Sequence, residues 1–329
     1  MQIRLFTPGD APAIVALWRD CVRAGDVVYR EPDEAYFRQK FLEDPNWEPA
    51  LCPVAEEGGR LIGCLLAAGQ KRPKTEAEAA RAYVVLMLVD AAHRGRGVGR
   101  AMLAALEEEL RARGKTELLI NSLSPIQLDW TIPGTPGHDH NNAPGLDAEC
   151  GGYGFFEKMG FENRHEEVAM YLNLKDYRYD EGIEGLRQKL RDEGIVVGRY
   201  DVSLRANFDR MCDRVGSEYW RDVLRAETAK EHPRVILAAV DQGRYMVGFT
   251  GPVDLQPSGR GWFTGICTDP EYERRGIATV LFNDLMREFV LEGAAFSTLF
   301  TGVDNHARRL YERTGFRAAR RFAIMRKSL

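Results

Sequence analysis

The stretch VVLMLVDAAHRGRGVGR, residues 84–100, joins an apolar run to a turn that holds three glycines and three arginines. The run is typical of a buried strand, and the residues after the turn have the apolar spacing of an amphipathic helix. The first N–H groups of a helix have no partner within it, and the helix dipole makes this end positive. Because glycine has no Cβ to keep a ligand away, this turn is suited to bind phosphate or pyrophosphate.

A second copy of this pattern lies in the other half of the chain, where GWFTGICTD (261–269) leads into PEYERRGIATVLFNDLMREF (270–289). Each half ends with a short helix that a glycine terminates, Gly160 or Gly315, and with a final strand. Each half also opens with a short strand and an amphipathic helix. These are predicted over 3–6 and 10–21 in the first half, and over 195–200 and 203–215 in the second. We therefore predict two α/β domains that are copies of one unit.

The distances between matching glycines locate an insertion in the first half. Gly97 and Gly160 are 160 minus 97, or 63, residues apart, and Gly276 and Gly315 are 315 minus 276, or 39, apart. The difference of 24 residues lies within 122–152, which is rich in Gly, Pro, Asn and Asp and predicts a long loop. The predicted domains are 1–176 and 195–329, with residues 177–194 as a polar linker that carries a short helix.

Composition narrows the class of protein. Of the 329 residues, 44% are apolar and 29% are charged, which is typical of a globular chain with two cores. A net charge of −4 excludes a general nucleic-acid-binding surface. Six cysteines without a CxxC pair predict reduced thiols. With no signal-like or membrane-spanning apolar stretch, we expect a cytoplasmic protein without a membrane partner.

The turns do not fit the common nucleotide motifs. Neither half contains GxxxxGK[ST], and the first half spells GxGxG instead of GxGxxG. The sequences HRGRGVGRAML (93–103) and PEYERRGIATVL (270–281) instead resemble the acyl-CoA motif [Q/R]-x-x-G-x-[G/A] of the GCN5-related N-acetyltransferase (GNAT) superfamily. NHARRLYERTGF (305–316) is similar to the family's Asn, Leu-Tyr and Gly-Phe signature. The resemblance implies two tandem GNAT-like domains, each a central mixed β-sheet flanked by helices, with a splayed strand pair that receives acetyl-CoA.

The resemblance also implies acetyl-CoA contacts in each half, with pantetheine on the strand and pyrophosphate on the turn. In the first half they are Met87, Leu88, Val89, Arg94, Gly95, Arg96, Gly97, Val98, Gly99 and Arg100. In the second half they are Ile266, Cys267, Thr268, Arg274, Arg275, Gly276, Ile277, Ala278 and Thr279, with Asn305 on the pantetheine or substrate side.

The family's reaction is direct attack of an amine on the thioester, and the departing thiolate needs a proton donor. The resemblance gives this role to Tyr311, because a phenol with a pKa near ~10 stays protonated at neutral pH. The first half has Phe156 at the matching place, with Tyr153 as an alternative donor, and the second has Glu273 where the family prefers Gln or Arg. We therefore expect the C-terminal domain to be catalytic and the N-terminal domain to be a degenerate or regulatory copy.

Several alternatives remain open from the sequence. The acceptor is a small-molecule amine or a peptide amine, and the chain is a monomer or homodimer. The alternative class is a non-catalytic acyl-CoA-binding or protein-interaction protein. A metal ion could bind at His138, Asp139 and His140. Because the sequence shows no third ligand, we instead expect these residues to stabilise the loop, and we predict no metal site. Cys267 is expected to be a buried structural thiol, because direct transfer needs no covalent intermediate.

Overall fold

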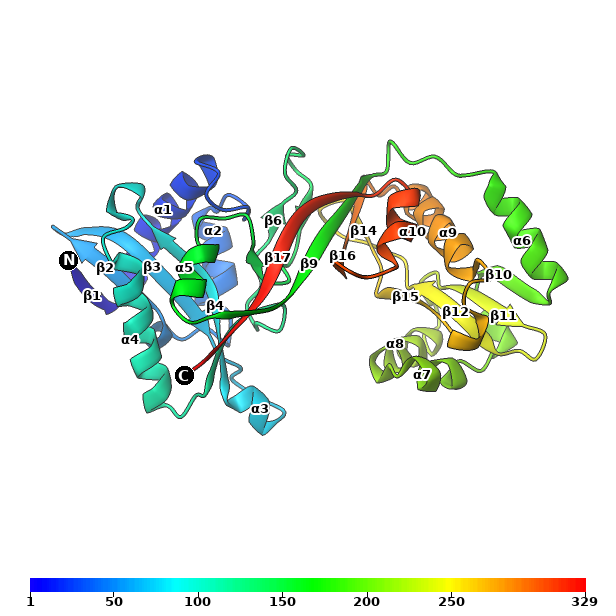
Figure 1. The fold of residues 1–329 in the computed structure, drawn as a ribbon, viewed down its shortest axis with the longest axis horizontal. Helices are drawn as coiled ribbons and strands as arrows, with labels where there is room; N and C mark the ends of the chain where they lie inside the picture. Colours follow the sequence, from blue (N-terminus) through cyan, green and yellow to red (C-terminus); the bar gives the residue numbers. More distant parts are fainter. The chain divides into compact units, whose positions relative to one another are not determined.

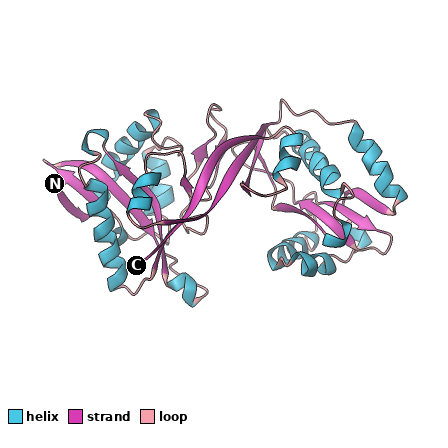
Figure 2. Ribbon diagram, in the orientation of Figure 1, coloured by secondary structure: helices cyan, strands magenta, loops and turns pink.

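The computed structural model of the protein describes residues 1–203 and 205–329. Mixed sheets flanked by helices confirm the predicted α/β class (Figures 1 and 2). The chain forms two compact units. Unit 1 consists of Met1–Ala169, Phe300–Asp304 and Ala318–Leu329, and unit 2 consists of Met170–Leu299 and Asn305–Arg317.

Unit 1 has a sheet in the order β1–β2–β3–β4–β5–β17, in which β4 and β5 are parallel and the other neighbours are antiparallel. Its strands are β1 (Gln2–Leu5), β2 (Pro53–Glu57), β3 (Arg60–Ala68), β4 (Arg81–Val89), β5 (Glu117–Ile120) and β17 (Arg317–Ser328). The β4–β5 register joins only Arg81–Tyr83 to Glu117–Leu119. Beyond Tyr83 the two strands separate, which is the predicted splayed pair.

Helices cover both faces of the unit 1 sheet (Figure 1). One core lies under α1 (Ala11–Arg23) and α2 (Glu34–Phe37), and the other lies under α4 (Val98–Ala112). Side chains of a strand alternate between its faces, so Val54 packs in the first core and its neighbour Ala55 in the second. Two short helices, α3 (Glu76–Ala79) and α5 (Tyr153–Lys158), complete the unit.

The last strand of the chain belongs to unit 1, although the second half of the sequence encodes it. Residues 325–328 of β17 pair with β5. Phe322, Ala323 and Met325 are 1%, 0% and 0% exposed. Arg320 donates to both carboxylate oxygens of Asp147 at 2.8 and 2.7 Å. The strand β9 (Glu162–Asn173) belongs to unit 1 as far as residue 169 and to unit 2 beyond it. The final strand of the second half therefore completes unit 1, which the sequence analysis did not predict, while β9 is divided between the two units.

Unit 2 has two groups of strands, in the orders β10–β11–β12–β15 and β9–β16–β14–β13. The strands are β10 (Ile195–Arg199), β11 (Leu237–Asp241), β12 (Met246–Gly251), β13 (Asp254–Leu255), β14 (Arg260–Trp262), β15 (Gly265–Thr268) and β16 (Phe296–Gly302). Helices α6 (Gly182–Asp192) and α9 (Ile277–Leu291) lie on one side of the first group, and α7 (Asp209–Val215) and α8 (Glu218–Thr228) lie on the other (Figure 1). The short α10 (Arg308–Arg313) precedes β17.

Three local predictions need correction. The strand predicted over 261–269 is divided into β14 and β15. The α-helix predicted over 203–215 begins at Asp209, because Asn207 forms a bridge with Tyr245 and Arg205 has a left-handed backbone (φ 46°); residue 204 lies outside the described residues. The loop predicted over 122–152 contains the short strands β6 (Trp130–Thr131), β7 (Asp139–His140) and β8 (Leu146–Asp147).

We predict that a fragment of residues 1–176 is much less stable than unit 1 in the whole chain. It lacks β17, and burial of one Phe or Met side chain contributes about 1.5–3 kcal/mol. We expect its midpoint of thermal unfolding to fall by about 10 °C or more. The matched control is the same fragment joined to residues 318–329 through a Gly/Ser linker, which should recover most of the loss. Equal midpoints for the two fragments would show that β17 is not needed to complete unit 1.

Candidate functional site

The turn between β4 and α4 of unit 1 is open. Gly97 caps α4 in a left-handed conformation (φ 85°), and Gly95 is also left-handed (φ 73°). A Cβ added to either glycine would meet no atom within 4 Å. The N–H groups at the start of α4 can therefore be reached by a ligand, as a phosphate-binding turn requires.

A cavity of about 450 Å³ adjoins this turn. Its walls come from β4, the turn, α5 and the segments before α2 and α5. It brings together Met87, Leu88, Val89, Arg94, Gly95, Gly97, Val98, Gly99 and Arg100 of the predicted N-terminal contacts. Arg96 is absent from the wall, and its half-exposed guanidinium lies 3.8 Å from Glu57. A cavity of this volume is large enough for a cofactor arm between two strands.

Arg94 holds two walls of the cavity together. Its Nε donates to the carbonyl of Val89 at 3.0 Å, and its other nitrogens donate to the two oxygens of Asp26 at 2.9 and 2.6 Å. The hydrogen bonds from Arg94 lower the pKa of Asp26. The hydrogen bonds of Arg94 therefore hold the end of β4 in place. A phosphate in the turn would bind mainly to backbone N–H groups and to Arg96 and Arg100.

The wall opposite β4 contains groups that the sequence analysis missed: Asp26, Tyr29, Asp147 and Cys150. Cys150 precedes Phe156 by six residues, just as Asn305 precedes Tyr311. This spacing is the one signal in the sequence that could have identified a member of this wall. Tyr153 is not part of the wall, and its hydroxyl accepts a hydrogen bond from Asn163 at 3.2 Å.

The matching turn of unit 2 is covered by its own chain. Gly276 caps α9 with φ 99°, as Gly97 caps α4. A Cβ added to Gly276 would lie 2.7 Å from both Cδ atoms of Leu186 on α6. The side chain of Leu186 therefore fills the space that the corresponding glycine of unit 1 leaves free. Beside it, the guanidinium of Arg275 lies 3.7 Å from the carboxylate of Glu193.

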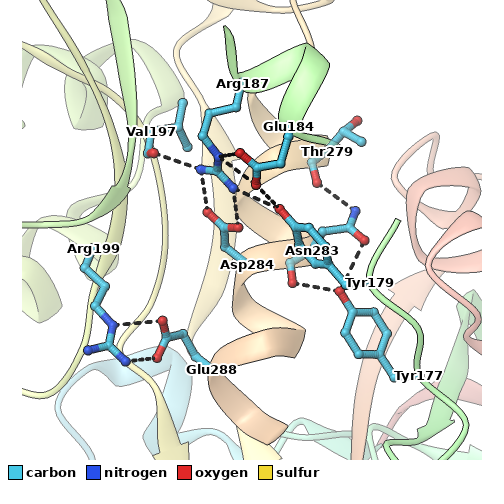
Figure 3. Close-up of polar contacts among 10 residues, drawn as sticks. All are labelled: Tyr177, Tyr179, Glu184, Arg187, Val197, Arg199, Thr279, Asn283, Asp284 and Glu288. Carbon is cyan, nitrogen blue, oxygen red and sulfur yellow. Dashed lines mark hydrogen bonds and ion pairs between the residues drawn. The ribbon is translucent and has the colours of Figure 1, made fainter. Parts of the chain in front are cut away.

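Buried polar contacts hold α6 against α9 (Figure 3). Arg187 donates to both oxygens of Asp284 at 2.9 and 2.6 Å and to the carbonyl of Val197 at 2.9 Å. The Arg187 and Asp284 side chains are only 11% and 10% exposed. The hydrogen bonds to Asp284 raise the pKa of Arg187, so its guanidinium stays charged. Tyr177 adds a hydrogen bond from its hydroxyl to the carbonyl of Asn283 at 3.0 Å.

Of the other predicted C-terminal contacts, some lie on β15 and some at the start of α9. Ile266, Cys267 and Thr268 form β15 and pair with β12. Burial raises the pKa of the Cys267 thiol to about 12, which agrees with a structural role. The side-chain oxygen of Asn305 accepts from the N–H of Ala307 at 2.9 Å. Residues 277–279 begin α9 after Gly276, and Arg274 is left-handed (φ 61°).

Tyr311 is a buried member of the aromatic core of unit 2. Its ring lies 4.9 Å from that of Phe282 and 6.3 Å from that of Phe316, and the residue is 7% exposed. Burial raises the pKa of its hydroxyl, so Tyr311 is protonated at neutral pH. Glu273 is exposed, and its charge is therefore solvated rather than buried at the turn.

Two other features of the described residues bear on function. They contain no group of three or more His, Cys, Asp or Glu that could hold a metal ion. In unit 1, His140 is 3% exposed and stacks on Trp130, while Asp139 accepts from the hydroxyl of Thr131 at 2.8 Å. No helix among residues 1–203 and 205–329 has the length and apolar character needed to cross a bilayer.

Comparison with known proteins gives consistent matches. Residues 13–124 and 203–316 each match the model of the acetyltransferase (GNAT) family. Acetyltransferase plu1384 of Photorhabdus laumondii is 26% identical over 171 residues, which is 52% of this chain and 93% of that protein. A tandem GNAT protein from the clavulanic acid biosynthesis pathway has a similar fold, with a TM-score of 0.53 and 16% identity over 99% of this chain and 98% of that one. The GCN5-related glucosamine N-acetyltransferase region of a fungal multi-domain β-N-acetylglucosaminidase has a TM-score of 0.63 and 15% identity; the match covers 99% of this chain but only 38% of that one.

We predict that Arg187→Ala destabilises unit 2 by about 3 kcal/mol, because it leaves the buried carboxylate of Asp284 without its partner. Arg191→Ala is the matched control on the same helix. The Arg191 side chain is exposed and donates hydrogen bonds to its neighbour Gln188, so we expect a change within about 0.5 kcal/mol. Urea unfolding measures both. Equal effects of the two substitutions would mean that the Arg187–Asp284 pair does not fix α6.

Proposed function

Because the chain belongs to the acetyltransferase (GNAT) family, we propose that it transfers an acetyl group from acetyl-CoA to an amine and binds acetyl-CoA in unit 1. The single observation that carries this proposal is the contrast between the two turns. Gly97 opens onto a cavity of about 450 Å³, whereas Gly276 is covered by Leu186.

The cavity of unit 1 fits the parts of acetyl-CoA in order. The N–H groups at the start of α4 and the arginines 96 and 100 suit the pyrophosphate. The edge of β4 that does not pair with β5, at Met87–Val89, suits the amides of the pantetheine arm, which would pair with it as an added strand does. Cys150 and Phe156 then lie on the wall at the α5 end. Acetyl-CoA supplies the thioester that the amine attacks.

Three tasks fall to the chain in such a transfer. A backbone N–H of β4 would polarise the thioester carbonyl, which a positioned donor does best in a site without water. A basic group or water would accept the proton of the amine, and an acid would protonate the thiolate. We propose a small-molecule amine or a peptide amine as acceptor. Its class is set by the walls around the segment 26–47 and the loop 122–152.

A second candidate places catalysis in unit 2 with Tyr311 as the acid. The observation that favours it is the match of residues 305–316 to the family signature, which Phe156 breaks in unit 1. Acetyl-CoA could then enter only after Leu186 leaves Gly276, which would require the buried contacts of Arg187 to break. The fixed cover over Gly276 therefore favours unit 1 as the site of binding.

A non-catalytic acyl-CoA-binding or interaction protein remains the alternative class. It differs from the proposal in one property: it would bind acetyl-CoA without releasing CoA in the presence of amines. We also propose a reducing compartment, the cytoplasm, because all six cysteines are free.

We predict that isothermal titration finds one acetyl-CoA site per chain and that Arg96→Glu weakens it about tenfold, through the loss of one positive charge and the gain of a negative one near the pyrophosphate. Arg275→Glu is the matched control, since both arginines directly precede the turn glycine of their unit. It should change the affinity less than twofold. Two sites per chain would mean that both units bind acetyl-CoA, and a large effect of Arg275→Glu alone would place the binding in unit 2.

We predict that Tyr311→Phe leaves kcat within about twofold of the unmodified chain, because the proposed transfer occurs in unit 1. The measurement is thiol release from acetyl-CoA with a panel of amines. The second candidate predicts instead a fall of about 100-fold, the usual size of a lost general acid, at an unchanged KM for acetyl-CoA. A fall of that size would replace unit 1 by unit 2 as the catalytic unit.

A further inference from the structure

We propose that the hydroxyl of Tyr29 donates the proton to the departing CoA thiolate in unit 1, in place of the hydroxyl that Phe156 lacks. The inference rests on the proposed function, because it concerns acetyl transfer in the same cavity. It also gives a role to the insertion within 122–152, which the sequence left without one.

Tyr29 is the one phenol among the described residues that line the cavity. Two other proton-carrying groups of the lining, His93 and Lys158, are less suitable. His93 is held by Asp90 at 2.7 Å and lies 3.4 Å from Glu57. Lys158 is exposed on α5. Tyr153, the alternative from the sequence, lies outside the wall and bonds to a neighbouring strand residue through its hydroxyl.

The insertion fixes the position of Tyr29. Tyr29 forms an antiparallel bridge with Trp130. On either side of this bridge, the N–H of Arg30 donates to the carbonyl of Asp129, and the N–H of Thr131 donates to the carbonyl of Val28, both at 2.9 Å. The Tyr29 ring packs edge-on against Trp18 at 6.2 Å. Backbone hydrogen bonds hold this segment on one side, and the buried ring of Trp18 holds it on the other. The hydroxyl of Tyr29 therefore stays in a fixed place.

The segment that carries Tyr29 is bonded to the turn, and it lines the cavity together with the end of the insertion. Asp26, three residues before Tyr29, is bound by Arg94 of the turn. Asp147 and Cys150, at the end of the insertion, line the same cavity as Tyr29. Cys150 has the spacing to Phe156 that Asn305 has to Tyr311, which assigns this end of the cavity to the acyl group.

The surroundings keep Tyr29 protonated until the thiolate forms. Burial raises the pKa of its hydroxyl, and the neighbouring Cys150 and Asp147 raise it further. Tyr29 is therefore suited to act as an acid and unsuited to act as the base for the amine.

The step balances as follows. The amine nitrogen forms a bond to the thioester carbon and loses a proton to a base or water, and the C–S bond breaks with its electron pair on sulfur. Sulfur then takes the proton of the Tyr29 hydroxyl, and the phenolate regains a proton from water. The net result is an amide and free CoA thiol, with no oxidant or reductant involved.

The test compares Tyr29→Phe with Tyr153→Phe in the full chain. Hydroxylamine serves as a small acceptor amine that needs no acceptor pocket, and thiol release from acetyl-CoA is the readout. We expect Tyr29→Phe to lower kcat about 100-fold, with KM for acetyl-CoA changed less than threefold. Tyr153→Phe should match the unmodified chain. Phe156→Tyr, added to Tyr29→Phe, should restore at least tenfold, because it returns a hydroxyl to the position of Tyr311.

Acetyl-CoA binding, measured by titration for each variant, separates the outcomes. Normal binding with a kcat of Tyr29→Phe within threefold of the unmodified chain overturns the role of Tyr29 and leaves the proposed function standing. Loss of binding in Tyr29→Phe overturns it too, since Tyr29 would then shape the cavity rather than donate a proton. An unmodified chain that binds no acetyl-CoA overturns the proposed function, and the role of Tyr29 with it.

Discussion

The ion pair between Arg187 and Asp284 fixes α6 on α9, and through α6 it fixes Leu186 over Gly276. This one constraint makes two similar turns unequal. Both turns place a left-handed glycine at the start of a long helix, where unpaired N–H groups favour an anion. In unit 1 the space beside the glycine is free, while in unit 2 an aliphatic side chain takes it. Sequence motifs alone do not reveal this difference, because both turns keep the glycine and the following small residue of the motif, Gly97 and Gly99 in one and Gly276 and Ala278 in the other.

Unit 1 is completed by a strand that the second half of the sequence encodes. β17 closes the sheet of unit 1 beside β5, and its Arg320 donates hydrogen bonds to Asp147 on the cavity wall. The unit with the open cavity is thus completed by residues from the far end of the chain. A tandem chain with this arrangement cannot lose its second half without exposing the edge of β5 and the core residues that β17 buries.

Much of the fold could be predicted from the sequence, because it depends on local patterns. The strand–turn–helix units, the glycines that end α5 and α10 and the splayed strands follow from periodicity and from the resemblance at residues 93–103 and 270–281. The site could be predicted only along β4 and its turn. Tyr29 and Asp147 come from irregular segments whose places depend on bridges to distant residues. Leu186 has the spacing of an ordinary helix residue, and only its contact with Gly276 gives it importance.

The most direct measurement of which unit holds the cofactor is hydrogen exchange of the full chain with and without acetyl-CoA. We predict that acetyl-CoA slows exchange of the amides in the turn 94–100 and along Met87–Val89, because these residues line the cavity that the ligand would fill. The amides of 274–279 should exchange at the same rate in both states. Slower exchange at 274–279, with none at 94–100, would contradict binding in unit 1.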